Sequence, residues 1–181
     1  MRKTRDQIYD ELLVLKCRQG DREAFEELVA RWQERLWVYA YEVTRSEAVA
    51  WDIVQETWIG IITGIRKLQD VAAWRRWAFR ILNNKAADQL RRHQLQARLG
   101  DQLLTQARQK PQNGNSDDEE YKLLQQAMAR LSPEQRGLLT LRYSEDFDLA
   151  QIAEILGIPE GTVKSRLHRT LEKLRQIVKQ I

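Results

Sequence analysis

The stretch Asp148–Ile181, DLAQIAEILGIPEGTVKSRLHRTLEKLRQIVKQI, decides the fold because it reads as two short helices joined by a tight turn. Asp148 can cap the first helix, since its carboxylate can accept hydrogen bonds from free backbone N–H groups. Gly157 ends that helix, because glycine tolerates the left-handed conformation of a helix terminus. Pro159 stands where a new helix starts, a position at which its missing N–H costs nothing. The sequence therefore predicts a helix-turn-helix.

The two helices of this unit each have an apolar side, and the second also has a basic side. The apolar residues recur at helical spacing and are Leu149, Ile152, Ala153, Ile155, Leu156, Val163, Leu167, Leu171, Leu174, Val178 and Ile181. The opposite side of the second helix carries Lys164, Ser165, His168, Arg169 and Glu172, and Arg166 and Lys173 add positive charge to the helix. The Lys, Ser, His and Arg side chains are of the types that contact base edges and phosphates. In a helix-turn-helix this second helix can lie in the DNA major groove. The residues alone leave open an ordinary helical hairpin with a solvated basic face.

A second pattern lies in a helix predicted over about 47–67. Its inner face is expected to be apolar and to consist of Val54, Trp58, Ile61, Ile62 and Ile65. Its outer stripe consists of Asp52, Gln55, Glu56 and Ile59, which fall at i, i+3, i+4 and i+7. A charged stripe of this kind is usually solvated surface, so the residues alone assign it no partner.

A third pattern lies in a helix predicted over about 72–95. A stripe along it consists of Trp77, Arg80, Asn84, Asp88 and Arg91, at i, i+3, i+7, i+11 and i+14. Such a stripe suits single-stranded DNA, because a base can stack on the aromatic ring, cations can hold phosphates and an amide can bond a base edge. The alternative is that Trp77 belongs to the core, and this helix taken alone favours the core.

Three segments resemble sigma-70-type transcription initiation factors, most closely the extracytoplasmic-function (ECF) branch. The segment 157–169, GIPEGTVKSRLHR, is similar to their second DNA-binding segment, which reads the −35 element. The segment 50–58, AWDIVQETW, is similar to the part that docks on the coiled coil of the polymerase's largest catalytic subunit. Trp51 stands where the family usually has an acidic residue, which alters the local contact.

The segment 74–92, WRRWAFRILNNKAADQLRR, is similar to the part by which sigma factors melt and read the −10 element. The family pattern has a Trp, an Asn seven residues later and an Asp four beyond that, which match Trp77, Asn84 and Asp88. Leu82 replaces a frequent small residue of the pattern, and we interpret that change as a packing variation.

The resemblance implies a role for each of the three patterns. The residues implied to bind core polymerase are Asp52, Gln55, Glu56 and Ile59. Binding of the −10 DNA would fall to Trp77, Arg80, Asn84, Lys85, Asp88, Arg91 and Arg92. Binding of the −35 DNA would fall to Lys164, Ser165, Arg166, His168, Arg169 and Lys173. The implied partners are core RNA polymerase, through its coiled coil and flap, together with promoter DNA and an anti-sigma factor.

We therefore expect an all-α chain of two small helical domains, 1–96 and 121–181, joined by a flexible linker over 97–120 that contains KPQNGNSDDEE. All six tryptophans lie in the N-terminal half, which is expected to have its own core. The linker's length suits two domains that dock separately. In the C-terminal domain, Ser132 and Gln135 predict a capped helix start, and the residues expected to pack against the helix-turn-helix are Leu138, Leu139, Leu141 and Tyr143.

The composition of the chain limits the classes of function that it can have. The chain has 181 residues, 43% of them hydrophobic, and a net charge of +4 that suits an anionic partner only weakly. The charge is sorted by segment: 66–98 holds nine Lys or Arg against two acids, and 42–56 holds four acids against one Arg. Cys17 is the single cysteine, so it can form no intrachain disulfide and is expected to be a buried structural thiol. No apolar signal core or membrane-spanning run is present, which predicts a soluble, cytoplasmic protein without membrane insertion.

Besides a sigma factor, two other classes of function can be compared with the same residues: a stand-alone regulator and an enzyme. A stand-alone helix-turn-helix regulator, with an N-terminal half that dimerises or binds a ligand, would explain the C-terminal half equally well. It would leave the paired acidic and basic-aromatic stripes unexplained. An enzyme is poorly supported, because the sequence has no glycine-rich phosphate loop, nucleophile motif or metal-ligand spacing. No cofactor or metal is expected.

Overall fold

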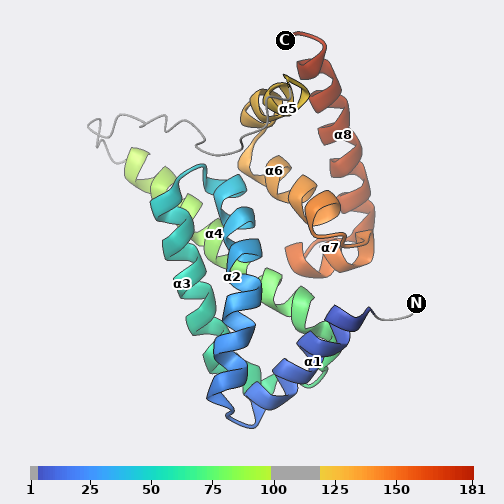
Figure 1. Cartoon of the computed structure of the whole chain (residues 1–181). Helices are drawn as coiled ribbons and strands as arrows, with labels where there is room; N and C mark the ends of the chain where they lie inside the picture. The colour runs from blue at the N-terminus through green and yellow to red at the C-terminus, as the bar shows by residue number, and fades with distance from the viewer. Residues whose placement is uncertain (1–3, 99–118) are drawn as a thin grey trace.

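The computed structural model of the chain describes residues 4–98 and 119–181, and within these residues its regular elements are all helical. The N-terminal domain contains α1 (Arg5–Arg18), α2 (Arg22–Thr44), α3 (Glu47–Gly64), the short 3-10 helices η1 (Ile65–Lys67) and η2 (Val71–Ala73), and α4 (Trp74–Arg98). The C-terminal domain contains α5 (Glu119–Ala129), α6 (Pro133–Leu139), the π-helical turn η3 (Thr140–Ser144), α7 (Leu149–Leu156) and α8 (Glu160–Val178). The predicted all-α class with two helical domains is confirmed (Figure 1).

Side-chain caps fix where the helices begin, as the sequence predicts. The Asp148 carboxylate accepts a hydrogen bond from the Gln151 N–H at 2.8 Å, and the Gln151 side chain accepts from the Asp148 N–H in return. Ser132 and Gln135 form the same reciprocal pair at the start of α6. Gly157 ends α7 with a φ of 66°, the left-handed conformation for which glycine was predicted there. These local signals place the turn between α7 and α8.

Tryptophans and aliphatic residues from α1 to α4 form the core of the N-terminal domain. Trp32 of α2 and Trp74 of α4 are both 1% exposed, and their rings meet edge to face at 6.0 Å between centroids. Cys17 is buried in α1, as predicted, and burial raises the pKa of its thiol to about 11. Ile62, which was expected on the inner face of α3, is 54% exposed. It lies about 100° around the helix from the buried Ile61, and so stands beside Ile59 on the outer side.

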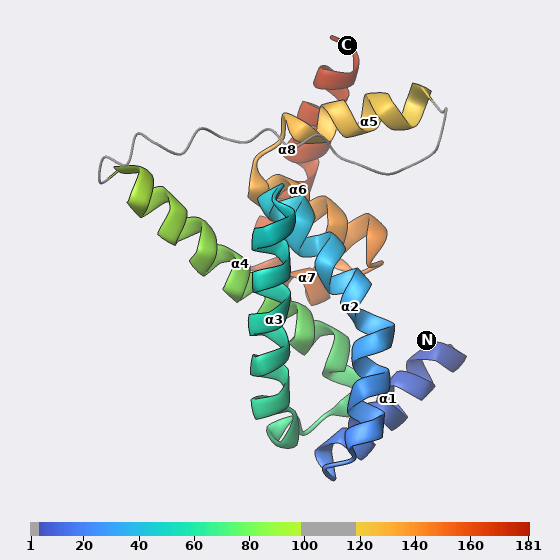
Figure 2. The ribbon, with the colours of Figure 1, turned by 60° about the vertical axis from the view of Figure 1, so that its left-hand side comes forward.

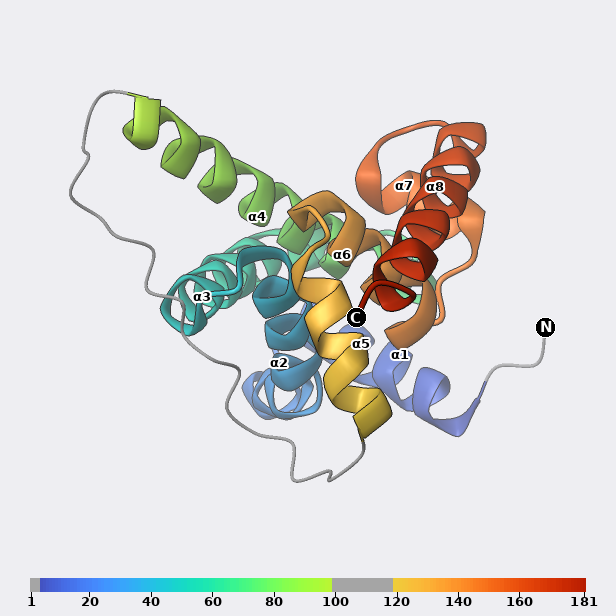
Figure 3. The same cartoon turned by 90° about the horizontal axis from the view of Figure 1, so that it is seen from above.

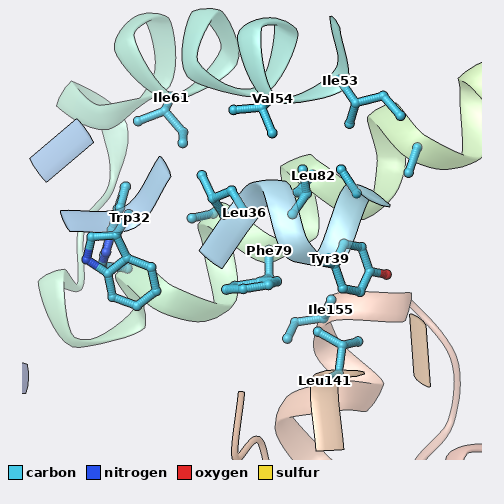
Figure 4. Close-up of a cluster of buried hydrophobic side chains, with 14 of the residues drawn as sticks. Trp32, Leu36, Tyr39, Ile53, Val54, Ile61, Phe79, Leu82, Leu141 and Ile155 are labelled. Atoms are coloured by element: carbon cyan, nitrogen blue, oxygen red, sulfur yellow. The ribbon is translucent and has the colours of Figure 1, made fainter. Parts of the chain in front are cut away.

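The two domains pack against each other, which the prediction of separate cores and separate docking did not anticipate. Helix α6 lies against α2, and α7 lies against α4. One continuous cluster of buried apolar residues runs from the N-terminal domain into the helix-turn-helix. Figure 4 shows Leu141 and Ile155 of the C-terminal domain next to Tyr39 and Phe79. A smaller cluster, formed by Ala127, Leu131, Leu139 and Ile177, holds α5 and α6 to α8.

Two further expectations concern segments of the C-terminal half. Tyr143 was expected to pack against the helix-turn-helix, but it is 58% exposed, because the π-helical turn η3 shifts the register after Leu141. Most of the predicted linker, residues 99–118, lies outside the residues that the structure describes, so its predicted flexibility stays a prediction.

Candidate polymerase and nucleic-acid interfaces

The acidic stripe of α3 lies on the outer surface of the N-terminal domain. Asp52 and Gln55 are exposed, and Ile59 is 63% exposed. Glu56 is half-buried, because its carboxylate forms an ion pair with the Lys85 ammonium of α4 at 3.2 Å. The structure adds Ile62, one turn beyond Ile59, which the sequence prediction had placed in the core. The stripe therefore combines acidic residues with two exposed isoleucines, a surface composition typical of a protein contact.

Next to this stripe, Trp51 is 42% exposed and its ring contacts the ring of Trp37 of α2, with 5.9 Å between centroids. Trp51 stands where an acidic residue was expected from the resemblance. Through this ring contact α2 covers part of the indole. The outer face around it keeps its acidic character through Asp52 and Glu56.

The basic-aromatic stripe lies along one side of α4. Its exposed members are Arg80, Asn84, Asp88, Arg91 and Arg92, and its half-buried members are Trp77 and Lys85. An ion pair of 3.1 Å joins Arg91 to Asp88. The C-terminal part of α4 projects beyond the neighbouring helices, so this part of the stripe is open to solvent on several sides (Figures 2 and 3).

Trp77 belongs partly to the core and partly to the surface. Its ring centroid lies 6.1 Å from that of Trp74, and the planes are inclined by 50°. The other edge of the ring covers Gly64 at the end of α3, where an added Cβ would lie 2.8 Å from a ring carbon. Only glycine at position 64 leaves room for this ring. The fold thus fixes one part of the indole and leaves another part accessible. The core interpretation of Trp77 therefore holds in part, and the stacking of a base on it stays a prediction.

Two neighbouring asparagines of α4 have different environments. The Asn83 side-chain oxygen accepts a hydrogen bond of 2.9 Å from the Tyr39 hydroxyl, whose pKa is raised by burial. Asn84 is exposed on the stripe. Of the two amides, that of Asn84 is therefore the one exposed to solvent, and its contact with a base edge stays a prediction.

The basic side of α8 is exposed along its length, and Lys164, Ser165, Arg166, His168, Arg169 and Lys173 all lie on it. The Arg169 guanidinium donates to the Ser165 carbonyl at 3.3 Å, which holds the side chain along the helix. Lys173 donates to the Gln135 side chain of α6 at 3.2 Å. The structure therefore brings the six predicted residues onto one surface, with Lys173 at its edge.

A cleft of about 350 Å³ lies between the domains. Tyr39, Ala87 and Leu90 line it from the N-terminal domain, and Pro133 and Leu156 line it from the C-terminal domain. Polar side chains, among them Asn83, Arg91 and Glu134, line it together with these apolar residues, and it is open to solvent. No local sequence pattern indicates this cleft, because its two walls come from segments far apart in the chain.

Comparison with known proteins assigns the chain to a family. Residues 28–96 match the family model for sigma-70 region 2, and residues 121–174 match that for sigma-70 region 4. The ECF RNA polymerase sigma factor SigL of Mycobacterium tuberculosis is 35% identical over 149 residues, covering 81% of this chain and 84% of the relative. The chain belongs to the ECF RNA polymerase sigma factors. This sigma factor is a transcription initiation factor, and the alternative of a stand-alone regulator is not favoured.

Further similarities of this sigma factor extend over most of its length. SigW of Bacillus subtilis, another ECF sigma factor, is 29% identical over 174 residues, covering 90% of this chain and 93% of the relative. Two solved structures share the fold at 24% identity each. CnrH, in complex with the cytosolic domain of CnrY, gives a TM-score of 0.69 over 95% of this chain and 98% of that one. RpoE of Bartonella quintana, in complex with the anti-sigma factor NepR, gives 0.71 over 86% and 96%.

Within residues 4–98 and 119–181, no three His, Cys, Asp or Glu side chains are grouped so that they could hold a metal ion. In the same residues, no helix has the length and apolarity that crossing a bilayer requires.

Proposed function

We propose that this sigma factor divides promoter recognition among three surfaces: the α3 stripe binds core RNA polymerase, the α4 stripe binds the opened −10 strand, and α8 binds the −35 duplex. The observation that carries the proposal is the Glu56–Lys85 ion pair of 3.2 Å. It joins an acidic surface to a basic-aromatic one on adjacent helices. A protein that docks beside the point at which it opens DNA needs two such surfaces next to each other.

At the −10 element the proposed mechanism uses binding energy and no covalent chemistry. Extruding a base costs a few kcal/mol in unstacking and unpairing. Stacking of a base on the accessible part of Trp77 would return about 1–3 kcal/mol, and the Asn84 amide would bond its edge. Arg80, Lys85, Arg91 and Arg92 would hold the phosphates, and Asp88 orients Arg91 through their ion pair.

At the −35 element, α8 would enter the major groove, as the second helix of a helix-turn-helix does. Lys164, Ser165, His168 and Arg169 would face base edges. Arg166 and Lys173 would contact phosphates, which fixes the register without reading sequence. Lys173 suits that role because it lies at the edge of the surface, next to Gln135.

We further propose an anti-sigma factor as a partner. RpoE of Bartonella quintana, which shares the fold, was solved in complex with such a factor. The cleft between the domains supports the proposal, because a ligand there would contact Leu90 of one domain and Leu156 of the other. A partner in the cleft would hold both domains at once.

The docking assignment is tested by charge reversal on α3. Asp52→Lys combined with Glu56→Lys should weaken binding to core polymerase in a pull-down by at least about tenfold, since like charges would face the partner. Glu34→Lys combined with Glu11→Lys, on other helices, is the control with the same charge change and should bind like wild type. Full retention of the α3 variant would remove the docking assignment.

A further inference from the structure

Three aromatic side chains form a row on the surface where the end of α2 lies beside the start of α3. The Trp51 ring lies 5.9 Å from that of Trp37, between centroids, and the Trp37 ring lies 5.1 Å from that of Tyr41, with these two planes inclined by only 12°. Trp37 and Tyr41 are half-buried, whereas Trp51, at the α3 end of the row, is 42% exposed. We call these three side chains the aromatic row.

At the α2 end of the aromatic row, the chain supplies a cation of its own. The Arg45 guanidinium lies over the Tyr41 ring at 5.8 Å and forms an ion pair of 2.7 Å with the Glu42 carboxylate. A guanidinium can stack on a ring and bind a carboxylate at the same time, because it is planar and carries its donors along the edge. This end of the row therefore offers a ring and an acid, and one arginine binds both.

At the α3 end of the aromatic row, a ring and acids are again present, but the chain provides no cation. Among residues 4–98 and 119–181, no Lys or Arg lies over the Trp51 ring, and neither Glu47 nor Asp52 forms an ion pair. Glu47 stands at i−4 from Trp51, so the two share one face of α3, and Asp52 follows Trp51 directly. Both acids are exposed. The open face of Trp51 is thus accompanied by unpaired carboxylates.

A second ring of the same domain shows what this combination of groups binds. The guanidiniums of Arg35 and Arg75 lie over the Trp32 ring at 4.6 Å and 5.7 Å. Both are also paired with the Glu145 carboxylate, at 2.6 Å and 3.7 Å. Here, as at the α2 end of the aromatic row, a ring next to a carboxylate binds arginine.

The charges around Trp51 select the class of partner. Exposed carboxylates repel the phosphates of nucleic acid and the head groups of an anionic membrane, and two copies of this face would bring like charges together. The exposed part of the Trp51 ring is only ~100 Å², since 42% of a tryptophan surface of ~250 Å² is accessible. A stable dimer buries about 800 Å² on each subunit. Charge and size therefore both favour a single cationic side chain that another protein presents.

We infer that the open face of Trp51 binds an arginine side chain of core RNA polymerase, which stacks on the indole and pairs with Glu47. The inference rests on the proposed function, because the aromatic row adjoins the α3 stripe: Asp52 follows Trp51, and Gln55 stands at i+4 from it. Arginine fits better than lysine, because its guanidinium is more weakly hydrated and lies flat on a ring. An acidic residue at position 51 would hold such a cation by charge alone, whereas Trp51 holds it by stacking.

Replacing the ring by an aliphatic side chain tests the inference. Trp51→Leu keeps apolar contact with Trp37 but removes the face for stacking, so binding to core polymerase, measured by titration of the labelled chain, should weaken about 3- to 30-fold. Trp51→Phe keeps an aromatic face and should stay within about twofold of wild type. Tyr143→Leu, at an aromatic residue that is 58% exposed in the C-terminal domain, is the matched control and should bind like wild type. Equal binding of Trp51→Leu and wild type would overturn the inference.

A double-mutant cycle tests whether the ring and the acid hold the same cation. Glu47→Gln removes the charge at i−4, and its effect on the start of α3 is the same with either residue at position 51. We expect Glu47→Gln to weaken polymerase binding about two- to fivefold in the wild-type chain. In the Trp51→Leu chain the same change should cost less than about 1.5-fold, because the shared cation is no longer held there. Equal losses in both chains would overturn the shared site.

Two results together separate this inference from the proposed function. If Trp51→Leu binds like wild type while Asp52→Lys combined with Glu56→Lys does not, the α3 stripe docks on polymerase and the stacking site is overturned. If both variants bind like wild type, the docking assignment itself fails, and the arginine site on Trp51 fails with it.

Discussion

Trp77→Leu separates the two roles that the structure gives this residue. About two thirds or more of a tryptophan surface of ~250 Å² is buried at Trp77, which at ~25 cal/mol per Å² is ~4 kcal/mol of packing. Leucine keeps most of that apolar contact with Trp74 and the Gly64 backbone, so we expect a loss of unfolding free energy of only about 1 kcal/mol. The aromatic face is lost entirely, and with it about 1–3 kcal/mol of base stacking. That loss corresponds to about 5- to 150-fold weaker binding of the −10 strand.

The assay uses each variant in complex with core polymerase. Anisotropy of a labelled −10 single strand measures stacking, permanganate reactivity of −10 thymines measures melting, and a −35 duplex serves as the probe that should not respond. Trp77→Tyr, which restores an aromatic face, should recover most of both signals. If Trp77→Leu binds the single strand like wild type and leaves permanganate reactivity unchanged, the stacking role is refuted.

Three further predictions concern other parts of the molecule. Arg169→Ala should lose about 1–3 kcal/mol on the −35 duplex that the chain prefers; an equal loss on all duplexes in a binding titration would make it a phosphate contact. Gly64→Ala should push the Trp77 ring outward and reduce permanganate reactivity, and unchanged reactivity would show that this ring position is not needed. The raised pKa of Cys17, about 11 against an ordinary 9, contributes stability below pH 9 that is lost as pH rises through 11. Unfolding titrations should therefore show wild type approaching Cys17→Ala above pH 9, and parallel curves would contradict this.

The sequence was sufficient for features that depend on neighbours along the chain. Asp148 and Gly157 mark the ends of α7 because a cap and a left-handed terminus are set by local backbone geometry. The exposed stripes of α3 and α4 follow from helical periodicity for the same reason. Ile62 was wrongly predicted to be buried because it lies at the boundary between the inner and outer faces of α3. At such a boundary, a shift of one residue in the helical pattern decides whether a side chain is buried.

The contacts between the domains depend on residues far apart in sequence, so no local sequence pattern could predict them. Glu145 and Arg35 are 110 positions apart, and Arg136 meets a carbonyl 93 positions away. Each reads as an ordinary charged residue of a helical chain. The position of Trp77, in the core or on the surface, was left open for a related reason. Its partial exposure depends on Gly64 of another helix, and the spacing of residues within α4 carries no information about that contact.

Run-off transcription by core polymerase, with and without the purified chain and on promoter and promoter-deleted templates, tests whether this sigma factor directs initiation. We expect a transcript that requires the chain, the −10 element and the −35 element together. Binding of the chain as a dimer to a palindromic operator, with no effect on the polymerase, would contradict it.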